Sequence, residues 1–171
     1  MATHASSLSD PPTVVQSVSP AKGLATLAVV VVAVAGFIGI STALGLASAY
    51  GGFLFVFYFT SLCHAAPEKF MPAVVGAFCG LTMAALLTQL PETMGSAGMA
   101  IALSFILAAI YAMIMGWVPI LVNNATMLFL TVGTIPALHA TATIAEMALS
   151  VLLAAAILGV AGVIIKLRAA R

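Results

Sequence analysis

The chain alternates between long apolar runs and short polar breaks, and this pattern predicts helical segments that cross a membrane. The first run, Gly23 to Leu46, contains no Asp, Glu, Lys or Arg. About 20 such residues cross a hydrocarbon core of roughly 30 Å, so this run is long enough to span a bilayer. We expect an all-α, polytopic membrane protein with six transmembrane helices, of which the second and fifth are short. The expected segments are 23–46, 50–63, 70–90, 97–116, 119–137 and 144–166.

The breaks between these segments contain residues that end helices. Gly45 to Gly52 is a hinge of small residues, whereas His64 to Lys69, Pro91 to Ser96 and Pro136 to Thr143 are polar turns. Trp117-Val118-Pro119 is typical of a membrane–water interface, where Trp rings favour the headgroup level.

The two ends of the chain differ from its centre. Residues 1–22 are rich in Ser, Thr, Pro and Ala without helical periodicity, so we expect a flexible tail there. Residues 23–166 form the predicted membrane domain, and residues 167–171 a basic cytoplasmic C-terminus. Ala47-Ser48-Ala49 is similar to a signal-peptidase site. The apolar stretch before it exceeds the roughly 7–15 residues of a signal peptide, so we expect the first helix to be retained.

Composition agrees with lipid as the solvent. Hydrophobic residues make up 64% of the chain and charged residues 5%, whereas a soluble domain carries about 25% charged residues. The net charge of +1 gives no basic field for nucleic acid, so we expect no nucleic-acid partner. Cys63 and Cys79 suit packing better than a disulfide framework or a metal site.

Charge placement predicts the topology. With six spans, every Lys and Arg falls on the side of the N-terminal tail, while Glu92 and Glu146 fall on the other side. This agrees with the positive-inside rule, so we expect both termini in the cytoplasm. An odd number of spans would place the C-terminal cations opposite Lys22. The cations concerned are Lys22, Lys69, Lys166, Arg168 and Arg171.

The first three segments align weakly with the last three. The alignment pairs His64-Ala65 with His139-Ala140 and brings together the short apolar segments 53–59 and 127–133. Three helices per half force opposite orientations, which is the 3+3 inverted repeat of many transporters. Such folds place their site where two short segments meet near the bilayer midplane. The alternative is a six-helix bundle whose loops merely have similar lengths.

Small residues recur at helical spacing. Gly76, Gly80 and Ala84 form one stripe, and Gly39 and Gly159 belong to similar stripes on the first and last segments. In lipid such stripes let helix backbones approach, so we expect helix packing there. A narrow lining for a small permeant is the other interpretation.

Polar residues at membrane depth are expensive, so each needs a partner or a function. Asn123 and Asn124 are candidates for a solute pathway. Their amides could equally bond freed backbone carbonyls of a broken helix, or neighbouring helices. His64 and His139 end short segments and are candidate entrance residues that gate or relay protons, although a loop-end His is more often solvated. Glu146 suits a helix N-terminus or an external vestibule.

The sequence contains no pattern of a catalytic site. No nucleophile with its base, paired carboxylates or phosphate loop is recognisable. We therefore expect no enzyme, and no catalytic, cofactor-binding or metal-binding residues.

Between residues 44 and 86, a Leu-Gly-Leu start at Gly45, a Gly52-Phe53 pair that opens an aromatic-rich short helix, and Gly80 in the next helix form one pattern. With this pattern, residues 44–86 resemble the first half of a family of small bacterial inner-membrane proteins known as domain of unknown function 1097. The later Trp117-Val118-Pro119 resembles its second half. The Trp that often precedes the family's Gly-Phe pair is replaced by Tyr50-Gly51 here, and the N-terminal tail is additional. The resemblance implies a bacterial inner-membrane location and no particular activity. The residues that carry it are Gly45, Gly52, Phe53, Phe59 and Gly80.

Two functional hypotheses follow. The first is a small-solute channel or secondary transporter, built from two three-helix halves and assembled as a homo-oligomer in the bilayer. The second is a non-catalytic accessory subunit that stabilises a larger membrane-protein complex, for which the low polarity, the small-residue faces and the long tail are suitable.

Overall fold

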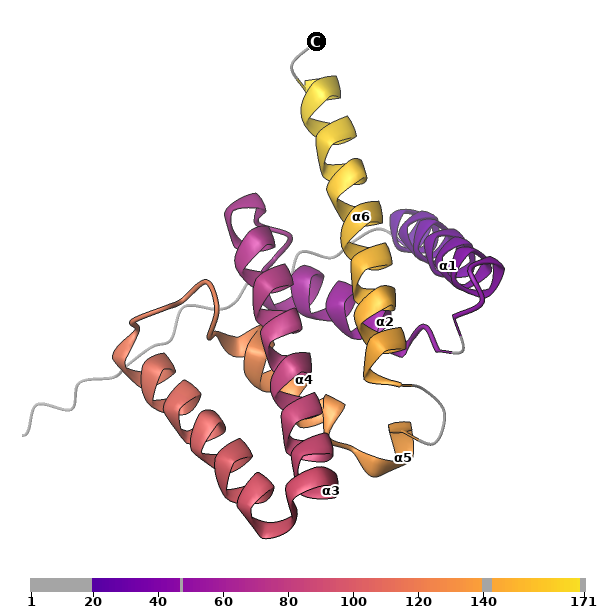
Figure 1. The fold of residues 1–171 in the computed structure, drawn as a ribbon. Coiled ribbons are helices and arrows are strands. Elements are labelled where there is room, and N and C mark those ends of the chain that lie inside the picture. Colours follow the sequence, from indigo (N-terminus) through magenta and orange to yellow (C-terminus); the bar gives the residue numbers. More distant parts are fainter. Residues whose placement is uncertain (1–19, 47, 140–142, 170–171) are drawn as a thin grey trace, which may run out of the picture. The chain divides into compact units, whose positions relative to one another are not determined.

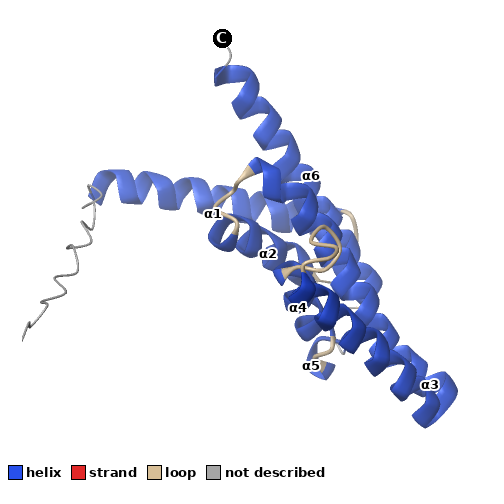
Figure 2. Cartoon of the chain, turned by 90° about the vertical axis from the view of Figure 1, so that its left-hand side faces the viewer, coloured by secondary structure: helices blue, strands red, loops and turns tan. Residues whose placement is uncertain are grey.

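The computed structural model describes residues 20–46, 48–139 and 143–169, and every regular element among them is a helix (Figure 1). Figure 2 accordingly shows only helices and loops in the described chain. The chain divides into two compact units, residues 1–35 and 36–171. Helix α1 begins in the first unit and continues into the second. The contacts below lie within the second.

The prediction of an all-α fold is confirmed for the described residues. The segments predicted at 50–63, 70–90, 97–116 and 144–166 agree with helices to within a few residues. The helices are α1 (Pro20–Ala43), α2 (Tyr50–Phe57) continued by a π-helix (Tyr58–Leu62), a 3-10 turn (Pro67–Lys69), α3 (Phe70–Met115), α4 (Asn124–Gly133), α5 (Pro136–His139) and α6 (Ile144–Ala169).

One predicted boundary differs by three residues, and one predicted segment is too long. Residues 20–22 belong to α1 rather than to the tail, whose other residues lie outside the described chain. The fifth segment is shorter than 119–137, because Asn123 caps α4 and the chain before it forms turns. At its other end α4 stops at Gly133, and α5 starts separately at Pro136, since the residue before a proline disfavours the helical region.

Helix α3 contains 46 residues, which as a straight helix would measure about 70 Å. A non-helical Gly95 (φ 59°, ψ −135°) divides it into two arms, residues 70–94 and 96–115, which fold back on each other (Figure 1). Glycine tolerates this positive φ without steric penalty. A Cβ on Gly98 would overlap the Leu90 carbonyl oxygen, so the arms touch near their tip. The turn predicted at 91–96 therefore depends on one glycine.

Two described helices are long and apolar enough to cross a membrane, Pro67–Met115 with its internal break and Ile144–Ile164. Only 17% and 28% of their most apolar windows are buried within the chain. The remaining apolar helices are shorter: Val31–Ala43, Tyr50–Leu62 and Asn124–Gly133. About 20 residues are needed to cross the hydrocarbon core. Tyr50–Leu62 and Asn124–Gly133 do not reach that length, whereas Val31–Ala43 is part of the longer helix α1.

The second unit packs as two close helix pairs. Helix α2 lies along α6, and α4 lies along the first arm of α3 (Figure 1). Their shared core contains side chains with under 2% exposure, drawn from four helices: Phe55, Leu81, Phe129, Met147 and Val151.

Glycines bring each pair into backbone contact. A Cβ on Gly51 would lie 2.5 Å from the Met147 carbonyl oxygen, and the Gly52 amide donates to Ser150 Oγ at 2.9 Å. A Cβ on Gly80 would overlap the Thr126 carbonyl oxygen of α4. Such close approach increases dispersion contacts between helices.

Two of the predicted glycine stripes do not bring helix backbones into contact in the described residues. Nothing lies within 4 Å of a Cβ built on Gly39, and Gly159 meets only the Phe70 ring, at 3.6 Å. The packing role predicted for Gly39 remains a prediction.

Candidate functional site

Asn123 organises the start of α4. Its side-chain oxygen accepts a hydrogen bond from the Ala125 amide at 2.9 Å, and its backbone amide donates to Thr126 Oγ1 at 3.1 Å. Together these form a capping box, which satisfies backbone donors at the helix N-terminus. Without this cap, the first amides of a buried helix would lack partners.

The Asn123 amide nitrogen joins α4 to α3. It donates to the Pro72 carbonyl of α3 at 2.9 Å, and to the Pro119 and Ile120 carbonyls of the preceding loop at 3.1 and 3.3 Å. An amide has two donor hydrogens and two acceptor lone pairs, so its capacity is used within the protein. Of the interpretations open from the sequence, this geometry matches bonds to freed backbone carbonyls and to a neighbouring helix.

Gly76 provides the space for this amide. A Cβ on Gly76 would overlap Asn123 Oδ1 and lie 2.7 Å from Nδ2. Both residues were singled out from the sequence, yet their pairing was not predicted, because neither residue indicates which helix faces which.

Asn124 differs from Asn123. Asn124 is exposed, and its side-chain amide has no hydrogen-bond partner among the described residues. It borders a hollow of about 280 Å³ where α2, α3 and α4 meet, which we call the Lys69 hollow. The lining residues are Tyr58, Leu62, Cys63, Lys69, Pro72, Ala73, Asn123 and Asn124.

A second polar cavity, the Glu92 hollow, has a volume of about 470 Å³. Thr88 and Thr134 donate to backbone carbonyls of their own helical segments, whereas the side chains of Gln89 and Glu92 have no hydrogen-bond partner among the described residues. The lining residues are Thr88, Gln89, Glu92, Thr134, Pro136, Thr143 and Ile144.

The Glu92 hollow adjoins a second cavity. It shares Gln89 and Ile144 with a neighbouring cavity of about 300 Å³ between α3 and α6. That cavity reaches Phe78, Leu81 and Thr82 along α3. The polar Glu92 hollow therefore borders a more apolar cavity, which we call the recess.

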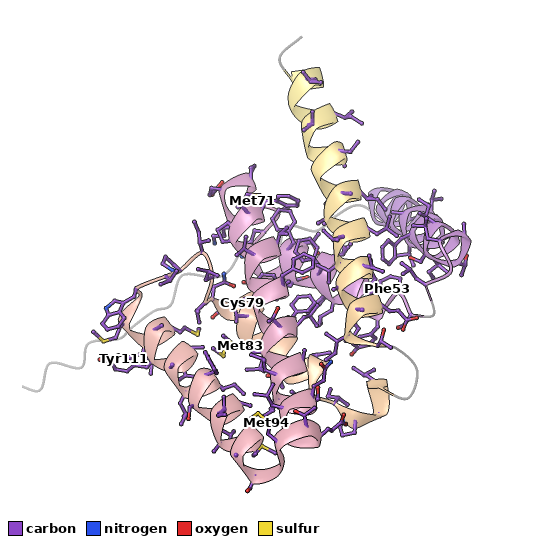
Figure 3. All side chains as sticks on the ribbon, in the orientation of Figure 1. Phe53, Met71, Cys79, Met83, Met94 and Tyr111 are labelled. Atoms are coloured by element: carbon purple, nitrogen blue, oxygen red, sulfur yellow. The ribbon has the colours of Figure 1, made fainter. Side chains whose placement is uncertain are left out.

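The two hollows lie at opposite ends of the first arm of α3. Lys69 directly precedes the arm and Glu92 lies in its last turn, about 35 Å away along the helix axis. Figure 3 shows the same separation, with Met71 near one end of the arm and Met94 at the other. The arm thus places a cation at one end and an anion at the other.

A buried apolar cluster, which we call the plug, lies at the part of α3 between the two hollows. Ala73 lines the Lys69 hollow and Leu81 lines the recess, about 12 Å apart along α3. Ala77, Phe55 of α2 and Phe129 of α4 belong to the same core cluster, and each is 0% exposed. Neither phenylalanine was named as a site residue, although both lie in the short segments 53–59 and 127–133 that the sequence alignment brought together.

The two predicted entrance histidines are not brought together. His64 is exposed in a left-handed turn (φ 53°) after the π-helix, and it does not line the Lys69 hollow. The backbone of His139 ends α5, which begins with Pro136 of the Glu92 hollow, while its side chain lies outside the described residues.

Glu146 caps α6. Its carboxylate accepts from the Thr143 amide at 2.7 Å, and its own amide donates to Thr143 Oγ1 at 3.2 Å. Thr143-Ile-Ala-Glu146 is a capping-box pattern that the sequence already contained. Of the two interpretations, the helix-terminus one matches this geometry.

Within the described residues, no group of three His, Cys, Asp or Glu side chains is arranged to hold a metal ion. Cys63 and Cys79 are both free thiols.

Comparison with known proteins gives no further identification. No protein-family model, curated protein or solved structure matches the chain. Its class is therefore defined by its own features: the described residues form helices only, two of which are candidate membrane-spanning helices, with two polar hollows and a buried apolar core.

Proposed function

We propose that this protein is a channel or secondary transporter for a small solute, which moves between the Lys69 hollow and the Glu92 hollow. It spans the bacterial inner membrane with six segments, has both termini in the cytoplasm, and assembles as a homo-oligomer. The observation that carries the proposal is the pair of polar hollows at opposite ends of one long apolar arm, with the buried apolar plug between them.

The exposed surface supports a membrane location. Large apolar side chains on both candidate spanning helices are open to the surroundings, including Leu107 at 65%, Ile114 at 77% and Val160 at 60% exposure. Soluble proteins rarely expose continuous apolar surfaces of this kind. Exposing these side chains to water costs free energy, whereas contact between them and lipid hydrocarbon does not, because lipid tails are as apolar as the side chains.

Helix directions support the alternating topology. The start of α4 contacts the start of α3 through Asn123 and Pro72, so these two helices begin at the same end. The starts of α2 and α6 meet through Gly52 and Ser150. In a chain of six alternating spans, the third and fifth segments (the first arm of α3, and α4) run in one direction. The second and sixth segments (α2 and α6) run in the opposite direction.

The pairing also supports an inverted repeat. The short helix of the first half, α2, packs on the last helix of the second half, α6. The short helix of the second half, α4, packs on the last helix of the first half, the first arm of α3. Each short helix then contributes one phenylalanine to the plug, Phe55 from α2 and Phe129 from α4. Transporters built from inverted repeats place their substrate site where the two halves meet. A hydrophobic constriction of this kind closes a path by excluding water.

Replacing the two asparagines separately tests the proposal in proteoliposomes. Asn124→Leu is expected to lower solute flux by up to about tenfold, because it removes one available hydrogen-bonding group at the mouth. It should leave stability unchanged, since the Asn124 amide has no partner among the described residues. Asn123→Leu removes a cap and an interhelical bond, and is expected to destabilise the fold by about 2–4 kcal/mol.

Thermal unfolding in detergent serves as the control for these variants. Wild-type flux in a folded Asn124→Leu protein would remove the Lys69 hollow from the pathway. Flux no higher than in protein-free vesicles would contradict the transport proposal itself.

The alternative is a non-catalytic accessory subunit of a larger membrane complex. One observation favours it: the second arm of α3 exposes small residues at helical spacing, Ala100, Ser104 and Ala108, which suit a partner helix. Purification in mild detergent distinguishes the two functions. A larger protein retained in fixed stoichiometry supports the subunit, whereas a homo-oligomer of this chain supports transport.

A further inference from the structure

The interior that separates the two hollows carries no charge. Between Lys69 and Glu146 the sequence contains only one Asp, Glu, Lys or Arg residue, and it is Glu92. Glu92 lies at the far end of the arm and not in the plug. Any solute that passes the plug does so without a compensating charge from the protein.

The buried polar groups in the described chain cannot substitute for such a charge. They are the hydroxyl of Tyr58, which lines the Lys69 hollow, and those of Ser41, Thr126 and Ser150. Ser41 Oγ has no hydrogen-bond partner among the described residues, but it borders a separate cavity beside α1. Thr126 already donates to the Leu121 carbonyl at 2.7 Å, and Ser150 to the Met147 carbonyl at 2.8 Å. An ion moved from water into such surroundings loses its hydration with nothing to offset the loss, whereas an uncharged polar solute loses far less.

The openings also discriminate against ions of either sign. Lys69 at one mouth attracts anions and repels cations, and Glu92 at the other mouth does the reverse. An ion of one sign therefore meets a like charge at one of the two ends.

Each mouth instead offers an uncharged amide. Asn124 borders the Lys69 hollow, and Gln89 borders both the Glu92 hollow and its recess. Neither amide has a hydrogen-bond partner among the described residues. A primary amide presents donors and acceptors together, so it complements a solute that also both donates and accepts hydrogen bonds.

We infer that the permeant is a small uncharged solute with both hydrogen-bond donors and acceptors, and that inorganic ions are excluded by the plug. This inference rests on the proposed function and names its substrate class. The Phe55–Ala77–Phe129 plug supplies the exclusion, and Asn124 and Gln89 supply recognition at the two mouths.

The test uses proteoliposomes of the full chain under osmotic shock, with light scattering as the readout. Urea, formamide and glycerol are the uncharged probes, and potassium chloride is the ionic probe, with a potential-sensitive dye reporting K⁺ or Cl⁻ movement. At least one uncharged probe is expected to equilibrate several-fold faster than in protein-free vesicles, with no dye response to potassium chloride. Gln89→Leu should slow that uncharged probe, whereas Gln89→Asn, which keeps the amide, should slow it less.

The possible failures are distinguishable. Movement of K⁺ or Cl⁻ above the protein-free rate would overturn the substrate class while leaving transport intact. If no probe moves, even through the folded Phe129→Leu variant with its smaller plug, the transport proposal fails and the inference with it. Equal rates for Gln89→Leu and wild type would overturn the recognition role of that amide.

Discussion

Gly80→Leu is expected to separate α4 from α3 and to destabilise the protein by about 3 kcal/mol or more. A side chain at Gly80 would overlap the Thr126 carbonyl oxygen and approach the Leu130 amide nitrogen to 2.9 Å. These are backbone atoms, so they cannot move aside by changing rotamer. Displacing α4 would also expose Phe129 and break the bond from Asn123 to Pro72. Denaturant titration in detergent micelles, followed by circular dichroism, measures the loss.

Gly39→Leu is the matched control for this substitution. It introduces the same side chain at a glycine within another apolar helix, where nothing lies within 4 Å of the added Cβ. Its effect should stay within about 1 kcal/mol, because removing a helical glycine is itself mildly favourable. Equal unfolding midpoints for Gly80→Leu and Gly39→Leu would contradict the packing described for α3 and α4.

Phe129→Ala is expected to open the path between the two hollows and to raise solute flux by about tenfold or more, equivalent to lowering the barrier by about 1.4 kcal/mol. Phe129 is 0% exposed and fills the plug together with Phe55 and Ala77. Its truncation leaves a cavity where the constriction excluded solutes and water. Stopped-flow osmotic measurements on proteoliposomes give the flux.

The same truncation weakens the core by about 3–5 kcal/mol, so folding must be monitored. Phe129→Leu removes less volume and should give a smaller increase in flux with better stability. Phe105→Ala provides the control, because Phe105 is 56% exposed on the second arm of α3 and lies outside the plug. If neither Phe129 variant exceeds Phe105→Ala in flux, the plug is not the barrier.

Much of the fold was predictable from the sequence, because lipid-soluble helices are apolar runs that end at glycines, prolines and polar turns. The turn at Pro91–Ser96 was predicted on that basis, and the structure assigns the reversal to Gly95. The start of α4 was missed, because Asn123 was treated as part of a membrane segment rather than as a cap.

The candidate site was less predictable, and the reason is physical. In a soluble helix the buried face is the apolar face, but in a membrane helix the lipid-facing and core-facing sides are both apolar. The sequence therefore does not distinguish buried Phe55 from exposed Phe57, two residues away. It likewise gives Gly39 and Gly80 the same spacing signal, although among the described residues Gly80 meets another helix and Gly39 does not.

The central proposition is that the Lys69 hollow and the Glu92 hollow open on opposite sides of a membrane. Cysteine labelling tests it directly, with Asn124→Cys and Glu92→Cys each made in a background where Cys63 and Cys79 are serine. A membrane-impermeant maleimide applied to intact cells is expected to label Glu92→Cys at once, and Asn124→Cys only after the membrane is opened. Labelling of both positions in intact cells, or recovery of the protein in the carbonate-soluble fraction, would contradict the proposed arrangement.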